Sequence, residues 1–349
     1  MRRGLIARSP DELPDAVLEA RLDRLRAAMV QAHLDALIVY TNNTRPAGVS
    51  WLTGFVPYWS EALLLVPRAG DPVLVVALTY RVKTWIERTS RVAEVIHTPR
   101  IGLEAGRRIA AQKPDAAVGI VEFDTLSAGI ADDLKQAAPR LALTDASELF
   151  ARQRARADEA EIALATKAAH IAHRALARVP RDATDAGQAI AAVEATARTM
   201  GAEEIYLAAA TDLGGDECLR RVEGEARLGR RFALRATVAY QGTWVRIVRT
   251  VERDGAAAEP AIARFAATLT RLPDTAGFAN FRAWLIEGCR TTQPLDTLIG
   301  SRAVASPAPL PGLVSVQAHI DVDGQPVLVG CPVVIEPRGA RPLVSPTFE

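Results

Sequence analysis

The chain has 349 residues, 49% of them hydrophobic, so it is long and apolar enough to form two cored domains. Its 42 lysines and arginines balance 41 aspartates and glutamates, and a net charge of +1 excludes a global field that would hold nucleic acid or an anionic membrane. The longest apolar runs are far shorter than the roughly 20 residues that cross a bilayer. We therefore expect neither nucleic acid nor a membrane as a partner.

Cysteine usage and the start of the chain indicate the cellular compartment. Cys218, Cys289 and Cys331 are widely spaced and form no CxxC or other zinc-binding pattern, which is typical of reduced thiols. Residues 1–12 contain two early arginines but not the apolar core of a secretion signal. These features predict a cytoplasmic protein.

The first part of the chain alternates helix and strand patterns. Apolar residues at helical spacing over 18–32 predict an amphipathic helix, and the apolar run 36–40 predicts the strand that it covers. Residues 61–66 and 72–77 are predicted as a strand hairpin with a turn between them. Further strands and helices are predicted in alternation at 92–97, 105–112, 117–122 and 126–137. This pattern favours a layered α/β domain that ends near Leu149.

An arginine-rich connection at 149–158 follows, so we expect one domain at 1–150 and a second at 151–349. The second domain begins with two alanine-rich amphipathic helices and continues with strands. The predicted helices are 158–179, 185–200, 260–272 and 279–289, and the predicted strands are 205–210, 232–240, 243–250, 313–320 and 326–336. Helices that lead into an antiparallel sheet are typical of an α+β domain.

Several motifs, in this order and spacing, resemble one known family. Residues 49–55 are similar to a "YLTGF" element, and residues 158–162 resemble the "KxxxEI" start of a catalytic domain. Residues 234–250 are similar to the hairpin "DxGxxxxGYxxDxTRT". With the opening helix and strand, these motifs make the chain resemble the creatinase, aminopeptidase P and prolidase family. The resemblance implies a creatinase N-terminal-like α/β domain and an α+β pita-bread domain, shortened here over 251–312.

The resemblance also identifies the positions that would hold metal. In the family's metallopeptidases, two hairpin aspartates, a histidine and two late glutamates hold two divalent ions. Here Arg235 and Arg246 take the aspartate positions, Gln317 and 329–331 take the glutamate positions, and 293–312 contain no histidine. A guanidinium group stays protonated, offers no lone pair and repels cations. We therefore expect no metal, no other cofactor and no metallopeptidase activity.

Two residues are weak candidates for metal-independent catalysis. Cys218 falls near the place where creatinase carries its catalytic histidine, and neighbouring arginines favour a thiolate, although a loop cysteine without a chemical role is the alternative. His319 either lines the remnant pocket or is a buried core histidine. His170 and His173 share a helix at spacing i, i+3, which we interpret as a solvated face.

Five residues are candidates for ligand binding. Arg235, Arg246 and Arg249 are predicted to bind a small anion, because guanidinium groups clamp carboxylates in bidentate fashion; pairing with nearby glutamates is the alternative. Since strand side chains alternate, Arg235 and Arg246 are expected to converge beside an acid or a bound anion. Tyr58 and Trp59 suit a subunit interface or a small anionic ligand, with an ordinary exposed loop as the alternative.

Two functional hypotheses remain open. The first is a metal-free, non-catalytic homologue of Xaa-Pro aminopeptidase and creatinase, a pseudoenzyme that acts as a partner subunit or a small-anion-binding module. Such a protein is expected to form a homodimer or to pair with an active paralogue. The alternative is a metal-independent hydrolase or lyase of the creatinase type, which acts on a C–N bond of a small amide, urea-like or carboxylate compound.

Overall fold

A computed structural model describes residues 8–57, 59–253, 258–290, 301–304 and 311–347. The chain divides into two compact units. The N-terminal unit contains the described residues up to Arg154 together with Cys289 and Arg290, and the C-terminal unit contains the remaining described residues from Ala155 onward. No helix in these residues is long and apolar enough to span a membrane.

The N-terminal unit is built on one six-stranded mixed sheet with the order β4-β3-β2-β1-β5-β6. Its strands are β1 (Ala36–Asn42), β2 (Glu61–Pro67), β3 (Val73–Val76), β4 (Glu94–His97), β5 (Ala117–Val121) and β6 (Ala142–Asp145). The central strand β1 pairs antiparallel with β2 and parallel with β5. β1 is buried over most of its length, because apolar side chains leave it on both faces.

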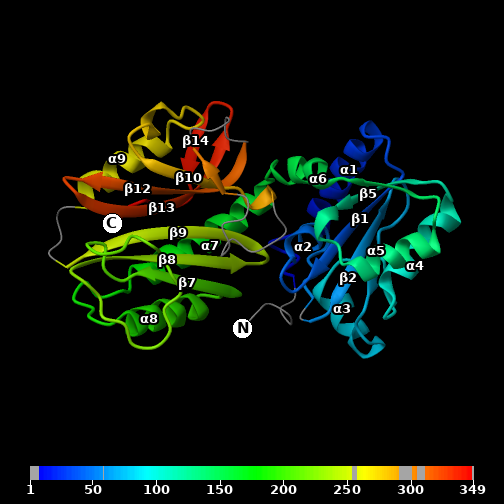
Figure 1. Cartoon of the computed structure of the whole chain (residues 1–349), viewed down its shortest axis with the longest axis horizontal. Helices are drawn as coiled ribbons and strands as arrows, with labels where there is room; N and C mark the ends of the chain where they lie inside the picture. Colours follow the sequence, from blue (N-terminus) through cyan, green and yellow to red (C-terminus); the bar gives the residue numbers. More distant parts are fainter. Residues whose placement is uncertain (1–7, 58, 254–257, 291–300, 305–310, 348–349) are drawn as a thin grey trace. The chain divides into compact units, whose positions relative to one another are not determined.

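Helices cover both faces of this sheet, as Figure 1 shows. They are α1 (Asp15–Gln31), α2 (Ala47–Thr53), α3 (Lys83–Thr89), α4 (Ile101–Gln112), α5 (Ala128–Ala137) and α6 (Ser147–Arg154). α4 and α5 pack on one core, and α1, α2, α3 and α6 pack on the other. The expected α/β domain is confirmed. The prediction of a charged connection at 149–158 was wrong in part, because residues 147–154 form helix α6 and its Phe150 and Ala151 are buried.

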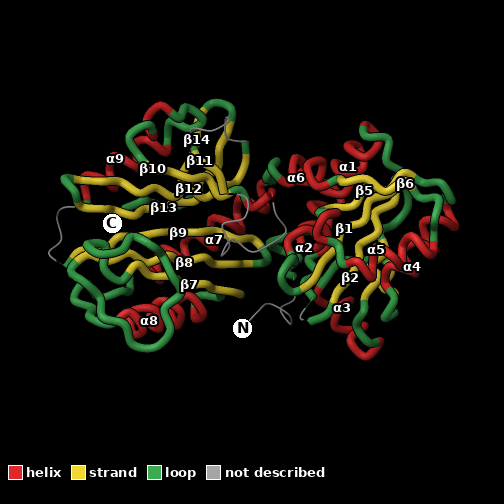
Figure 2. The backbone as a smooth tube through the Cα atoms, viewed as in Figure 1, coloured by secondary structure: helices red, strands yellow, loops and turns green. Residues whose placement is uncertain are grey.

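The C-terminal unit is built on an eight-stranded antiparallel sheet (Figure 2). Its main path runs β11-β10-β12-β13-β9-β8-β7, and β14 pairs with β13. The strands are β7 (Glu204–Ala210), β8 (Arg231–Tyr240), β9 (Thr243–Glu252), β10 (Arg282–Ile286), β11 (Ser301–Ala303), β12 (Gly312–Val322), β13 (Gln325–Glu336) and β14 (Gly339–Pro342). β13 and β9 share one backbone pair, Gly330 with Val248, and the Thr250 hydroxyl of β9 also bonds to the backbone of Leu328 on β13, so the two halves of the sheet are joined over a short stretch.

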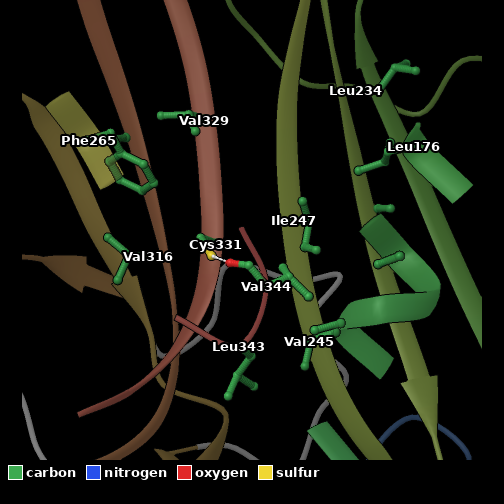
Figure 3. Close-up of a cluster of buried hydrophobic side chains, with 14 of the residues drawn as sticks. Leu176, Leu234, Val245, Ile247, Phe265, Val316, Val329, Cys331, Leu343 and Val344 are labelled. Carbon is green, nitrogen blue, oxygen red and sulfur yellow. Dashed lines mark hydrogen bonds between the residues drawn. The ribbon is translucent and has the colours of Figure 1, made fainter. Parts of the chain in front are cut away.

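Three helices pack on one face of this sheet. They are α7 (Glu159–Leu176), α8 (Ala186–Thr199) and α9 (Glu259–Leu269). The side chains of Asp158 and Asp185 cap α7 and α8 by accepting backbone N–H groups. Both halves of the sheet contribute to the core beneath the helices, where Val245 and Ile247 of β9 lie among the side chains drawn in Figure 3. The expected α+β pita-bread domain is confirmed.

One predicted element in this unit is wrong. Residues 279–289 were expected to form a helix, but Arg282–Ile286 form strand β10, which pairs antiparallel with β12. Ala283 and Leu285 enter the core while Arg282 and Trp284 do not. This alternation has the period of two that is typical of a strand. Pairing with β12 therefore stabilises these residues as a strand and not as a helix.

Candidate functional site

The sheet of the C-terminal unit has a second face that points away from α7, α8 and α9. We call it the open face, and define it by Arg235, Thr237, Arg246, Ser315, Gln317 and His319, which alternate with core residues along β8, β9 and β12. Polar and charged groups therefore gather on one side of the sheet.

Arg246 is the most buried charged group on this face, with 1% of the residue exposed. It lies directly opposite Thr237 and donates from Nε to the Thr237 hydroxyl at 3.3 Å. Its backbone N–H donates to Ser315 Oγ at 3.1 Å, where β9 and β13 diverge. Arg235 is opposite Val248 and partly exposed, so the two arginines are diagonal neighbours, about 7–8 Å apart between Cα atoms in a typical sheet.

Arg249 lies on the other face, which corrects its assignment to the same anion site. It is three residues beyond Arg246, an odd number, so its side chain points toward the helices. The buried guanidinium donates to the carbonyl oxygens of Val248, Gly330 and Ser345 at 3.0, 2.9 and 2.9 Å. Burial lowers the pKa of Arg249 to about 10, so it remains protonated at neutral pH. Arg249 therefore links the segment around Ser345 to strands β9 and β13 through these hydrogen bonds.

Two of the glutamates near the arginines have contacts of their own. Glu204 accepts a hydrogen bond from the Tyr206 hydroxyl at 2.7 Å. Glu217 forms an ion pair with Arg282 and lies 3.3 Å from His319 Nδ1. Glu217 is therefore committed to a different part of the open face from Arg246.

The two weak catalytic candidates belong to the same hollow. Cys218 and His319 both line a hollow of about 710 Å³. Glu217, Arg282 and Trp284 line the same hollow. Sequence reasoning missed Arg282 and Trp284 because it assigned them to a helix; the alternation of β10 was the signal that could have placed them on this face.

Arg235, Arg246, Gln317 and Gly330 occupy the described positions that the resemblance assigns to metal ligands. Among the described residues there is no group of three or more histidine, cysteine, aspartate and glutamate side chains that could hold an ion. Gly330 is opposite Gln317, and a Cβ on it would lie 3.0 Å from Cγ2 of Val248, which leaves little room for a glutamate. Oxygen-rich ligation, which hard divalent cations require, is not offered by these positions. The absence of a bound metal stays a prediction.

The neighbouring Cys331 belongs to the core. It is fully buried, and its Sγ donates to the carbonyl of Val344 at 3.4 Å (Figure 3). Burial raises the pKa of the Cys331 thiol to about 11, so it stays protonated at neutral pH and is a poor metal ligand.

The remaining candidates belong to the N-terminal unit. Tyr58 lies outside the described residues. Trp59 is 49% exposed and stacks on Trp85 with ring centroids 6.4 Å apart and an interplanar angle of 4°. Arg45 forms an ion pair with Glu122 within this unit. An interface or ligand role for Trp59 stays a prediction.

Comparisons with known proteins agree with this architecture. Residues 21–156 match the model of the Creatinase/Prolidase N-terminal domain. The structure is similar to X-Pro aminopeptidase from Thermotoga maritima MSB8 and to prolidase from Pyrococcus horikoshii OT3, each with a TM-score of 0.70, 15% identity and coverage of 93% of this chain and 97% of that chain. It is also similar to a dipeptidase from Mycobacterium ulcerans, with a TM-score of 0.66, 18% identity and coverage of 96% and 97%. No curated protein matches the sequence.

These identities establish the fold over nearly the whole chain, and the domain match places its first part within one family. The class is thus the two-domain fold of Xaa-Pro peptidases and prolidases. Residues 21–156 match the Creatinase/Prolidase N-terminal domain, and they are followed by a pita-bread-type unit with the fold of the X-Pro aminopeptidase and prolidase structures.

Proposed function

We propose that this chain is a metal-free member of the family that does not cleave peptides and instead binds a small anion on the open face. The observation that carries the proposal is the position of Arg246, a buried guanidinium on the face where the family's carboxylates would hold metal. Arg235 adds a second positive charge on the same face, diagonal to the first.

The electrostatics of the pair support an anion. Like charges on one face of a sheet repel, and at an effective dielectric constant of about 20 two unit charges cost about 2 kcal/mol at a separation of about 8 Å. A carboxylate or phosphate between them replaces this repulsion by two attractions and can accept bidentate hydrogen bonds from a guanidinium group. The same charges oppose the binding of a divalent cation.

The test is the thermal stability of the full chain in a titration of small mono- and dicarboxylates and inorganic phosphate. We expect a concentration-dependent rise in Tm for at least one anion, because a ligand that binds only the folded state stabilises it. The variant R235Q, at a partly exposed site, should abolish the rise without unfolding the chain, and R246Q should do the same if it folds.

A matched control is R264Q, which removes an arginine from the exposed side of α9, where it lies over Phe281. This variant should keep the rise in Tm. The proposal fails if no anion raises Tm, or if R264Q weakens the effect as much as R235Q does.

A homodimer, or a complex with an active family member, remains part of the proposal, and a measurement of the mass of the protein in solution tests it.

A further inference from the structure

The N-terminal unit contains a cavity of about 420 Å³, which the anion proposal does not use. It lies between helix α1, the end of α2, the turn from β2 to β3 and the segment before β4. Its volume lies within the range of about 300–1,000 Å³ that is usual for small-molecule sites. We call it the α1 cavity, and its floor is formed by Leu18, Leu22, Leu52, Leu64 and Val92.

The apolar floor begins where α1 stops packing into the core. Leu25 and Met29 of this helix are fully buried in the core on this side of the sheet. Leu18 and Leu22 continue the same helix face toward the start of α1, at spacings of three and four residues, and line the cavity. Leu22 and Val92 are only partly buried, so apolar surface is open to a ligand. Each methylene group that a ligand buries there should strengthen binding about fourfold.

Arg91 stands at the mouth of the cavity, and acids of α1 neutralise its charge. Its Nε lies 3.1 Å from Asp15 Oδ2, and its Nη2 pairs with Glu19. Its backbone N–H donates to the carbonyl oxygen of Thr53 at 2.8 Å, which holds the segment before β4 against the end of α2. An anionic ligand would have to displace an acid of α1 from Arg91. The positive charge of this arginine is therefore already used within the protein.

A well-fixed turn presents the carboxylate of Asp71 at the same mouth. Arg26 donates from Nε to the carbonyl oxygen of Pro67 at 3.3 Å and from Nη2 to that of Gly70, which directly precedes Asp71. Asp71 is exposed, and none of the described residues forms a hydrogen bond or an ion pair with its carboxylate. Asp23 also lines the mouth, and its ion pair with Arg26 spans 4.0 Å. Two carboxylates thus accompany one arginine, and the net charge of this part of the mouth is negative.

We propose that the α1 cavity binds a small aliphatic amine in its ammonium form, with the alkyl chain on the apolar floor and the ammonium group at Asp71 and Asp23. Like the lysine side chain, an alkylamine is protonated at neutral pH, and its ammonium group has three donors for the carboxylates. A carboxylate on the same alkyl chain would be repelled by these two acids. The cavity belongs to the N-terminal unit and the anion site to the C-terminal unit, so this inference does not rest on the anion proposal.

The test is the affinity of the full chain for n-alkylammonium chlorides of two to five carbons, measured by saturation-transfer NMR at constant ionic strength. We expect the affinity to rise about fourfold with each added methylene group until the floor is covered. Pentanoate, which carries the butyl chain on a carboxylate, should not compete with butylammonium. D71N should weaken the binding of butylammonium about two- to fivefold, which corresponds to the loss of an exposed ion pair.

Two further variants separate the floor from the mouth. L22A should reduce the gain in affinity per methylene group, because it shortens a residue of the floor. D115N is the matched control for D71N: it removes an exposed acid from the turn before β5, outside the cavity, and should bind butylammonium as wild type does.

The inference is overturned if no alkylammonium ion binds, if the affinity does not depend on chain length, or if pentanoate competes with butylammonium. Equal affinities in D71N and D115N would also overturn it. If butylammonium binds only to a variant that lacks residues 1–7, the occupant of the cavity is a segment of the chain itself and not a free amine.

Discussion

His173 is expected to make the stability of the C-terminal unit depend on pH. The residue lies near the end of α7 and is partly buried against the core, which corrects the view that this helix face is fully solvated. Burial, and then the positive charge of Arg249, lower the pKa of His173 to about 4 from its ordinary value of 6.5. The folded chain therefore keeps this imidazole neutral where the unfolded chain protonates it.

The sign and size of the effect follow from this difference. Between pH 6.5 and about 4 the unfolded state binds the extra proton, so the free energy of unfolding falls as the pH falls. The full stabilising contribution is present above pH 6.5. A shift of this size corresponds to a loss of about 2 kcal/mol between pH 7.5 and pH 5, which we reduce to about 1 kcal/mol because the ring is partly exposed to solvent.

Urea unfolding of wild type, H173Q and H170Q at pH 7.5 and pH 5 measures the contribution. Carboxylates also titrate in this range, so the informative quantity is the difference between variants and not the change in wild type alone. H173Q should lose about 1 kcal/mol less than wild type between the two pH values. His170, three residues earlier on α7 and exposed, is the matched control, and H170Q should behave as wild type. Equal losses in wild type and H173Q would refute the reasoning.

Three further predictions concern the site and its surroundings. Elemental analysis after mild dialysis should find well under one manganese, cobalt or zinc ion per chain, and a panel of proline peptides should show no turnover with added manganese; a tightly held ion would contradict this. R249M should lower the free energy of unfolding by about 3 kcal/mol, because two buried carbonyls and one partly buried carbonyl lose a charged donor, and a loss under about 1 kcal/mol in urea would count against it. G330A should cost about 1–3 kcal/mol through its contact with Val248, and a Tm equal to that of wild type would show that the site accepts a side chain.

The elements that could be predicted from the sequence are those with a clear local pattern. The run of apolar residues in β1 and the motif that spans β8 and β9 were enough to predict these three strands, while the pairing of Arg246 with Thr237 comes from the structure. β10 was mistaken for part of a helix because its alternation covers only five residues, and its pairing with β12 establishes it as a strand.

The candidate site was predictable only in part for a similar physical reason. The motif gives the position of Arg249 in the sequence but not the face of β9 on which its side chain lies. Side chains alternate between the two faces, so the face follows from the number of residues between Arg249 and Arg246. Glu217 and His319 are 102 residues apart in sequence. Their contact is produced by the order of strands in the sheet and by the loop after β7, so no local pattern predicts it.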